Sequence, residues 1–238
     1  MIRSAGSRSV PGTGSARAEC ARLLLATVLL LGTGALASSD RARAQAGGPV
    51  SSVLGVEETE ALVRRVHYEG MPEDEAARIG ADGTARLIEM LADPAEAPHH
   101  ARILLALGIS GGPGAFEAIE AWVVEAPADG EIDRAGFRAW QTLPFALGKL
   151  ARRDPRAFAR LAALFDAQPP DWTFRHFTGA RLRALEQRAA AAALAETGTP
   201  EALRVLDAVE RSAADPELVD HIRAVRAEAS ARKAESSR

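Results

Sequence analysis

An all-α fold is the class that the sequence predicts, and three observations lead to it. Hydrophobic residues make up 47% of the 238 residues, and most of them are alanine and leucine, which lose little rotamer freedom in a helix. They recur at helical spacing over most of the chain after Val56. Runs that alternate Val, Ile, Thr and aromatic residues, the pattern typical of strands, are missing.

The N-terminal residues 1–37 have the organisation of a signal peptide. Arginines precede the apolar run Leu23–Leu31, and a small-x-small site ends at Ala37. We therefore predict cleavage between Ala37 and Ser38 and a protein that is exported, either to the periplasm or to the medium. Cleavage after Ala44 is the alternative. The run is shorter than the roughly 20 residues of a membrane-spanning helix, so we expect no membrane partner once the leader is removed.

Composition excludes several classes of function for the mature chain. The only cysteine, Cys20, leaves with the leader, so neither disulfides nor cysteine chemistry is expected. The remaining residues include 25 basic and 31 acidic side chains, a net charge of −6, without a long basic block. A nucleic-acid partner and an anionic membrane surface are therefore not expected. Residues 38–55, rich in Gly, Ser, Ala and Arg, read as a flexible linker.

Helices are expected between stop signals of the Asp-Pro and Gly type over residues 56–232, and residues 233–238 are expected to form a disordered tail. Asp166–Gly179 is the longest irregular stretch. Gly108 is expected to be a helix C-cap, and Pro144 is expected to kink the helix that contains it. The expected helical segments are 56–69, 73–79, 83–92, 98–109, 114–125, 132–150, 155–165, 180–196, 201–211 and 216–232.

A short motif recurs along these helices at an offset of about 40 to 47 residues, within the range of two-helix repeat units. Its copies are Ala106-Leu107-Gly108, Ala146-Leu147-Gly148 and Ala193-Leu194-Ala195. Together with Leu87–Leu91, Asp93-Pro94, Ala101-Arg102, Ala115 and Ile119, these residues make the chain resemble the HEAT/armadillo superfamily. The resemblance implies an α-solenoid of about four antiparallel helix pairs. A non-repetitive helical bundle is the alternative.

The candidate binding site lies in the irregular stretch. Trp172, Phe174, Arg175 and His176 belong to the densest aromatic and cationic cluster of the chain. Long irregular loops are often functional, and tryptophan and arginine are typical interface anchors. The alternative is that the aromatic rings pack the loop onto the helices and leave Arg175 exposed.

Other clusters point less clearly to chemistry. His99 and His100 are neighbours, which on a helix point about 100° apart and cannot easily share one ion, so no metal site is predicted. Gly111, Gly112 and Gly114 resemble a phosphate loop or half of a nucleophile motif, but a tight corner between helices explains them more simply. A further set could line a charged groove: Glu117, Glu120, Glu125 and Arg102.

The predicted function is a non-catalytic scaffold of the cell envelope or periplasm that binds another protein, without a cofactor. Repeat folds commonly offer extended surfaces for such partners. One alternative is an enzyme, because some proteins that resemble this superfamily are lyases; Asp171, Arg175 and His176 would then be the acid-base candidates. The other alternative is a scaffold anchored in the membrane by an uncleaved Leu23–Ala37 segment.

Overall fold

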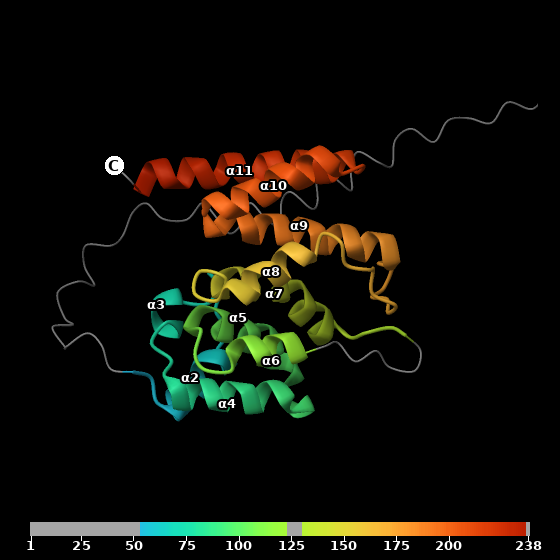
Figure 1. The fold of residues 1–238 in the computed structure, drawn as a ribbon. Helices are drawn as coiled ribbons and strands as arrows, with labels where there is room; N and C mark the ends of the chain where they lie inside the picture. Colours follow the sequence, from blue (N-terminus) through green and yellow to red (C-terminus); the bar gives the residue numbers. More distant parts are fainter. Residues whose placement is uncertain (1–52, 123–129, 237–238) are drawn as a thin grey trace, which may run out of the picture. The chain divides into compact units, whose positions relative to one another are not determined.

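The fold is all-α, as predicted. The computed structural model describes residues 53–122 and 130–236, so the predicted leader, its cleavage site at Ala37 and Ser38 and most of the linker lie outside the described residues. Within the described part, the chain forms α-helices, one 3-10 helix and isolated β-bridges, without a strand (Figure 1).

In chain order the helices are α2 (Val56–Arg64), α3 (Glu73–Ala76), α4 (Ala81–Ala92), the 3-10 helix η1 (Pro94–His99), α5 (His100–Ser110), α6 (Ala115–Ala121), α7 (Arg134–Leu150), α8 (Pro155–Ala163), α9 (Gly179–Thr197), α10 (Pro200–Ser212) and α11 (Pro216–Ser236). The two longest connections between the helices are 122–133, before α7, and 164–178, before α9. Side-chain caps explain several starts. Asp133 accepts a hydrogen bond from the Gly136 N–H at 2.8 Å, and Asp154 accepts one from the Arg156 N–H at 2.8 Å.

The boundaries differ from the expected ones around α5. Proline 98 lies inside η1, and α5 begins only at His100. The prediction that Gly108 caps this helix is wrong, because α5 continues to Ser110 and its C-cap is Gly111, with φ of +60° in the left-handed region.

Other boundaries differ as well, since α2 ends at Arg64 instead of residue 69 and α3 ends at Ala76 instead of residue 79. The helix α6 ends at Ala121, and Trp122 has extended backbone, whereas the sequence predicted a helix to Glu125; residues 123–129 lie outside the described part. The helix α11 extends to Ser236 and so includes residues that were expected in the tail. Proline 144 is buried inside α7.

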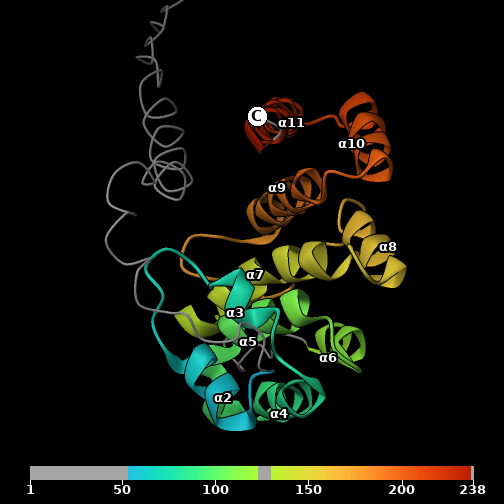
Figure 2. The ribbon, with the colours of Figure 1, turned by 90° about the vertical axis from the view of Figure 1, so that its left-hand side faces the viewer.

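Four long helices pack in series, each on the next: α5 on α7, α7 on α9 and α9 on α11. Figure 2 shows α6, α8 and α10 along one side of this series. Each of them contacts the series helix before it and the one after it. At the N-terminal end, α2 and α4 pack against each other and against α5. All these helices belong to one unit, Val50–Arg238.

The recurring sequence motif lies at the crossings of this series. A Cβ atom on Gly108 of α5 would lie 2.3 Å from the carbonyl oxygen of Ala146 in α7. A Cβ atom on Gly148 of α7 would lie 3.1 Å from the Cβ of Ala193 in α9. The first copy of the motif therefore packs on the second, and the second packs on the third. Small residues recur because the helix backbones approach closely there.

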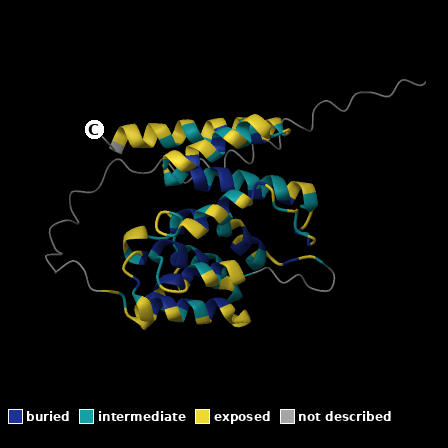
Figure 3. Ribbon diagram, in the orientation of Figure 1, coloured by how far each residue is buried: buried dark blue, intermediate teal, exposed yellow. Residues whose placement is uncertain are grey.

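The apolar core has two parts. The larger part runs through the helix series from Leu62 to Ile222 and consists mainly of Leu, Ile and Ala. Figure 3 shows its buried residues along the faces where α5, α7 and α9 meet. The smaller part, which we call the aromatic cluster, joins α7 and the start of α9 to the irregular segment 164–178 that precedes α9. Its buried residues are Ile132, Phe137, Trp140, Trp172, Phe174 and Leu182.

Candidate functional site

A cavity of about 360 Å³ lies beside the aromatic cluster. The helices α6, α7, α8 and α9 and the irregular segment before α9 all contribute to its wall. Its lining residues are Ile119, Glu120, Trp122, Trp140, Leu143, Leu147, Arg160, Gln168, Pro170, Asp171, Trp172 and Glu186. We call this the tryptophan cavity, because all three tryptophans of the chain line it.

The tryptophans are held by packing from several directions. Trp140 and Trp172 are 7% and 6% exposed, and their rings meet edge to face with centroids 5.1 Å apart. Trp122, at the end of α6, is partly buried and donates its indole N–H to Nδ1 of His100 at 3.3 Å. The aromatic walls are therefore anchored to α5, α7 and the irregular segment, and edge-to-face pairs of this kind add to the energy of simple burial.

A buried carboxyl group stands among these rings. Glu186 of α9 is 8% exposed, and burial raises its pKa because the charged form loses its hydration. The positive charge of Arg160 and a hydrogen bond with Trp140 act in the opposite direction and offset part of this shift in pKa. A carboxylate can accept about four hydrogen bonds, so Glu186 retains capacity to bind a ligand.

The other charged residues of the cavity lie closer to solvent. Arg160 of α8 donates from Nε to the carboxylate of Glu120 of α6 at 2.8 Å, and both side chains are partly exposed. Asp171 is exposed in the irregular segment. The cavity therefore has carboxyl groups both at its buried wall, through Glu186, and near solvent.

The structure separates the four predicted site residues. Trp172 lines the cavity, whereas Phe174 is 9% exposed and stacks on Phe137 with ring centroids 4.1 Å apart. Arg175 and His176 are exposed and form a tight turn, in which Arg175 has a φ of +52°. Of the acid-base candidates of the enzyme alternative, Asp171 lines the cavity and Arg175 and His176 do not.

Backbone hydrogen bonds hold the irregular segment in place. The Ile132 N–H donates to the Thr173 carbonyl at 2.9 Å, and the Thr173 N–H donates to the Gly130 carbonyl at 2.8 Å. The Phe174 and Phe177 backbones exchange hydrogen bonds of 3.1 and 2.9 Å across the turn. Although irregular, this wall of the cavity is therefore fixed by several backbone contacts.

Sequence reasoning missed Glu186, Trp140 and Arg160. A signal for Glu186 exists, because Leu182, Glu186 and Ala190 are spaced by four residues and so share one face of a helix. Since Leu182 and Ala190 are both buried, the carboxyl group between them faces the interior. No comparable signal marks Arg160, which becomes a site residue only because α8 lies beside α6.

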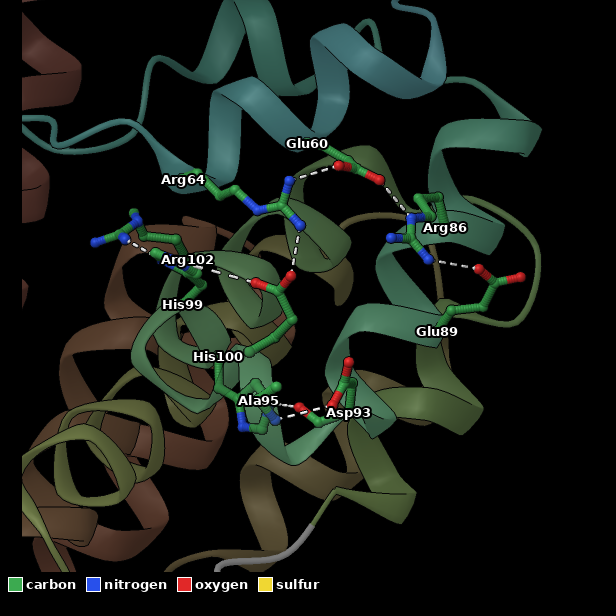
Figure 4. Close-up of polar contacts among 10 residues, drawn as sticks. Glu60, Arg64, Arg86, Glu89, Asp93, Ala95, His99, His100 and Arg102 are labelled. Carbon is green, nitrogen blue, oxygen red and sulfur yellow. Dashed lines mark hydrogen bonds and ion pairs between the residues drawn. The ribbon is translucent and has the colours of Figure 1, made fainter.

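The histidine pair is part of a polar network between α2, α4, η1 and α5 (Figure 4). Arg64 of α2 forms ion pairs with Glu60 of the same helix, at 2.6 Å, and with Glu96 of η1. The second pair connects α2 to η1. Arg102 donates to Nδ1 of His99 at 2.6 Å. Burial, and secondly the charge of Arg102, lower the pKa of His99, so the structure favours its neutral form.

These contacts give the network a structural role. The described residues contain no group of three or more His, Cys, Asp or Glu side chains that could hold a metal ion. The second histidine, His100, contacts the Asp93 carbonyl at 3.2 Å and accepts from Trp122. The two histidines therefore connect η1, α5 and α6 and are not simply solvated.

The charged groove suggested by the sequence does not form as a unit. Glu117 and Glu120 pair with Arg156 and Arg160 of α8, at 2.7 and 2.8 Å. Arg102 instead donates to the Val63 carbonyl at the end of α2. Glu125 lies outside the described residues.

The glycine-rich corner between α5 and α6 is closely packed, as expected for a tight turn. A Cβ atom on Gly112 would lie 2.2 Å from Oγ1 of the buried Thr84. Arg153, in the turn after α7, donates to the Ser110 carbonyl at 2.9 Å and also to the Ile109 carbonyl, and so caps the end of α5.

Comparison of the chain with protein-family models, with curated proteins and with solved structures gave no significant match. Among the helices of the described part, none is long and apolar enough to cross a membrane.

Proposed function

We propose that this chain is an exported helical-repeat scaffold of HEAT/armadillo type, which binds another protein through the tryptophan cavity and performs no catalysis itself. It would act in the cell envelope or periplasm after removal of residues 1–37. The observation that carries the proposal is the position of all three tryptophans around one cavity, at the point where the irregular segment interrupts the helix series.

The packing of the helices supports a short solenoid. The helices group as four pairs, α4 with α5, α6 with α7, α8 with α9 and α10 with α11, and the second member of each pair packs on the next second member. In a solenoid each repeat contacts its neighbours and shares a continuous core with them. Recurrence of the Ala-Leu-Gly motif at successive crossings is the sequence counterpart of this arrangement.

The cavity has the properties of a recognition pocket. Tryptophan and arginine are enriched among the residues that dominate binding energy at protein interfaces, in pockets that exclude water. Here buried rings form rigid walls, while Gln168 and Asp171 are exposed and accessible to a partner. Rigid helices hold most of the lining residues, which keeps the geometry defined before a partner arrives.

Site-specific crosslinking in living cells tests the proposed site. A photo-crosslinking residue in place of Gln168, at the cavity, is expected to give a discrete adduct with one protein. The matched control replaces Arg204, which is exposed on α10 away from the cavity lining. Equal labelling at both positions, or no adduct at Gln168, would contradict binding at this cavity. The adduct should disappear when Asp171 is changed to Arg and persist when Asp166, exposed but not part of the lining, is changed to Arg.

N-terminal sequencing of the protein recovered from cells tests export separately. A start at Ser38 or Gln45 would support a cleaved leader. A start within the first residues, with the protein in the membrane fraction, would favour the anchored alternative instead.

A further inference from the structure

We propose that the tryptophan cavity receives a basic side chain, arginine or lysine, from the partner protein. This inference rests on the proposed function and specifies the chemistry of the same site. It follows from three properties of the cavity: the charges of its lining, the nature of its walls and its size.

The charges of the lining are unbalanced. Three carboxyl groups line the cavity, those of Glu120, Asp171 and Glu186, against the single guanidinium of Arg160. Arg160 forms a 2.8 Å ion pair with Glu120. Arg160 also acts on Glu186, so one guanidinium faces three carboxyl groups, and a cation from outside would complement the lining.

The walls favour the same type of ligand. The face of a tryptophan ring attracts cations, and arginine and lysine side chains use this attraction most strongly where water is excluded. Trp140 and Trp172 are almost fully buried, and Trp140 lies close enough to Glu186 to lower the pKa of its carboxyl group. A basic side chain could thus pack its methylene groups on the rings and direct its charge to Glu186.

Burial of Glu186 is a further reason for this site to bind a cation. Burial raises the pKa of this carboxyl because its charge is poorly solvated, and Arg160 offsets only part of that effect. A second cation beside Glu186 would stabilise the carboxylate further.

The volume of about 360 Å³ lies near the lower end of the range for ligand pockets, about 300 to 1,000 Å³. A cavity of this size suits one side chain better than a folded segment or a large cofactor. We therefore assign it to a single basic residue presented by the partner.

Tryptophan fluorescence provides a direct test on the full chain, because all three tryptophans line the cavity and no other indole contributes to the emission. The probes are N-acetyl-arginine amide and N-acetyl-lysine amide. N-acetyl-citrulline amide is the neutral counterpart that retains the size and shape of the arginine probe, and N-acetyl-norleucine amide lacks only the terminal ammonium group of the lysine probe. We expect the cationic probes to change the emission with at least about tenfold tighter apparent binding than their neutral counterparts.

Variants identify the groups that bind the charge. Glu186→Gln and Asp171→Asn should each weaken the arginine probe about tenfold or more and leave the citrulline probe unaffected. Asp166→Asn, a matched change outside the lining, should leave both probes unaffected. Thermal unfolding of each variant verifies that the loss of binding does not come from loss of the fold.

Two outcomes would overturn the inference. Equal binding of charged and neutral probes would show that the cavity selects apolar shape and not charge. Tighter binding of choline than of both amino-acid probes would assign it to a small soluble cation. If the basic probes fail while the crosslink at Gln168 persists, the scaffold function stands and only the ligand chemistry is wrong.

Discussion

The helix crossings and the aromatic cluster pack with different kinds of side chain, small residues at the crossings and large rings in the cluster. At the crossing of α5 and α7, Gly108 brings one helix backbone directly against another, so little space is left. In the aromatic cluster, large rings such as Trp140 and Trp172 bridge between a helix and an irregular segment. Beside these rings the structure has a cavity and a buried carboxyl group, Glu186.

The difference separates the parts that stabilise the fold from the part suited to binding. Small residues recur at the two crossings where α5 meets α7 and where α7 meets α9. Within the described residues the aromatic cluster occurs once, and a cavity of about 360 Å³ remains beside its rings. A site therefore becomes possible where the repeat is interrupted, while the regular helices on both sides keep it rigid.

The largest effect in this comparison is expected for Gly108→Ala. The added methyl group would lie 2.3 Å from the Ala146 carbonyl oxygen, so α5 and α7 must move apart. This cost should exceed the gain in helix propensity and leave a net loss of about 2 to 3 kcal/mol in the free energy of unfolding. Chemical denaturation followed by circular dichroism measures it. An unchanged midpoint would show that the crossing is looser than the structure indicates.

The aromatic cluster should tolerate a change in side-chain volume better than the crossing at Gly108, and Phe137→Leu tests this. Phe137 stacks on Phe174 at 4.1 Å, and the change removes that ring contact while retaining an apolar side chain. We expect a loss of about 1 to 2 kcal/mol in unfolding free energy. The tryptophan emission should also change, since the rings of Phe137 and Trp140 are neighbours, with centroids 5.8 Å apart. A loss larger than that of Gly108→Ala would reverse the proposed ranking of the two regions.

A smaller change, of opposite sign, is expected for Glu186→Gln. Its pKa in the folded state is raised above the ordinary value of 4.5 by burial, so the fold favours the protonated form. The contribution of Glu186 to stability is complete below about pH 4.5 and is lost as pH rises through the raised folded-state pKa. The glutamine variant should therefore be more stable than the natural protein near pH 7.

Melting temperatures measured from pH 4 to pH 8 test this prediction. The advantage of the glutamine variant should appear as pH rises and should nearly vanish at pH 4, where both side chains are neutral. Glu89→Gln, on an exposed side chain paired with Arg86, is the control for general effects of removing a negative charge. An advantage that is independent of pH would contradict the assigned role of burial.

Local and long-range features differ in how well the sequence predicts them. Apolar stripes, proline starts and aspartate caps are local, and they predicted the helical class and most helices. Gly108 shows the limit, since a glycine near a helix end ordinarily predicts a cap, while its actual role depends on Ala146 in another helix. The cavity forms where four helices meet one irregular segment, an arrangement that local sequence patterns do not reveal. Of the four residues predicted for the binding site, only Trp172 lines the cavity.

The smallest effect is expected for Gly148→Ala, the counterpart of Gly108→Ala at the next crossing. The new methyl group would lie 3.1 Å from the Cβ of Ala193, a tight contact that a slight shift of α9 can relieve. Alanine also gains up to about 1 kcal/mol of helix propensity over glycine, so stability should change by less than about 1 kcal/mol in either direction. The third copy of the motif already carries alanine at the corresponding position, Ala195, which is buried. Denaturation midpoints of the two alanine variants, measured side by side, test whether the crossings differ. If both variants lose the same stability, the crossings are equivalent, and the close approach at Gly108 is not special.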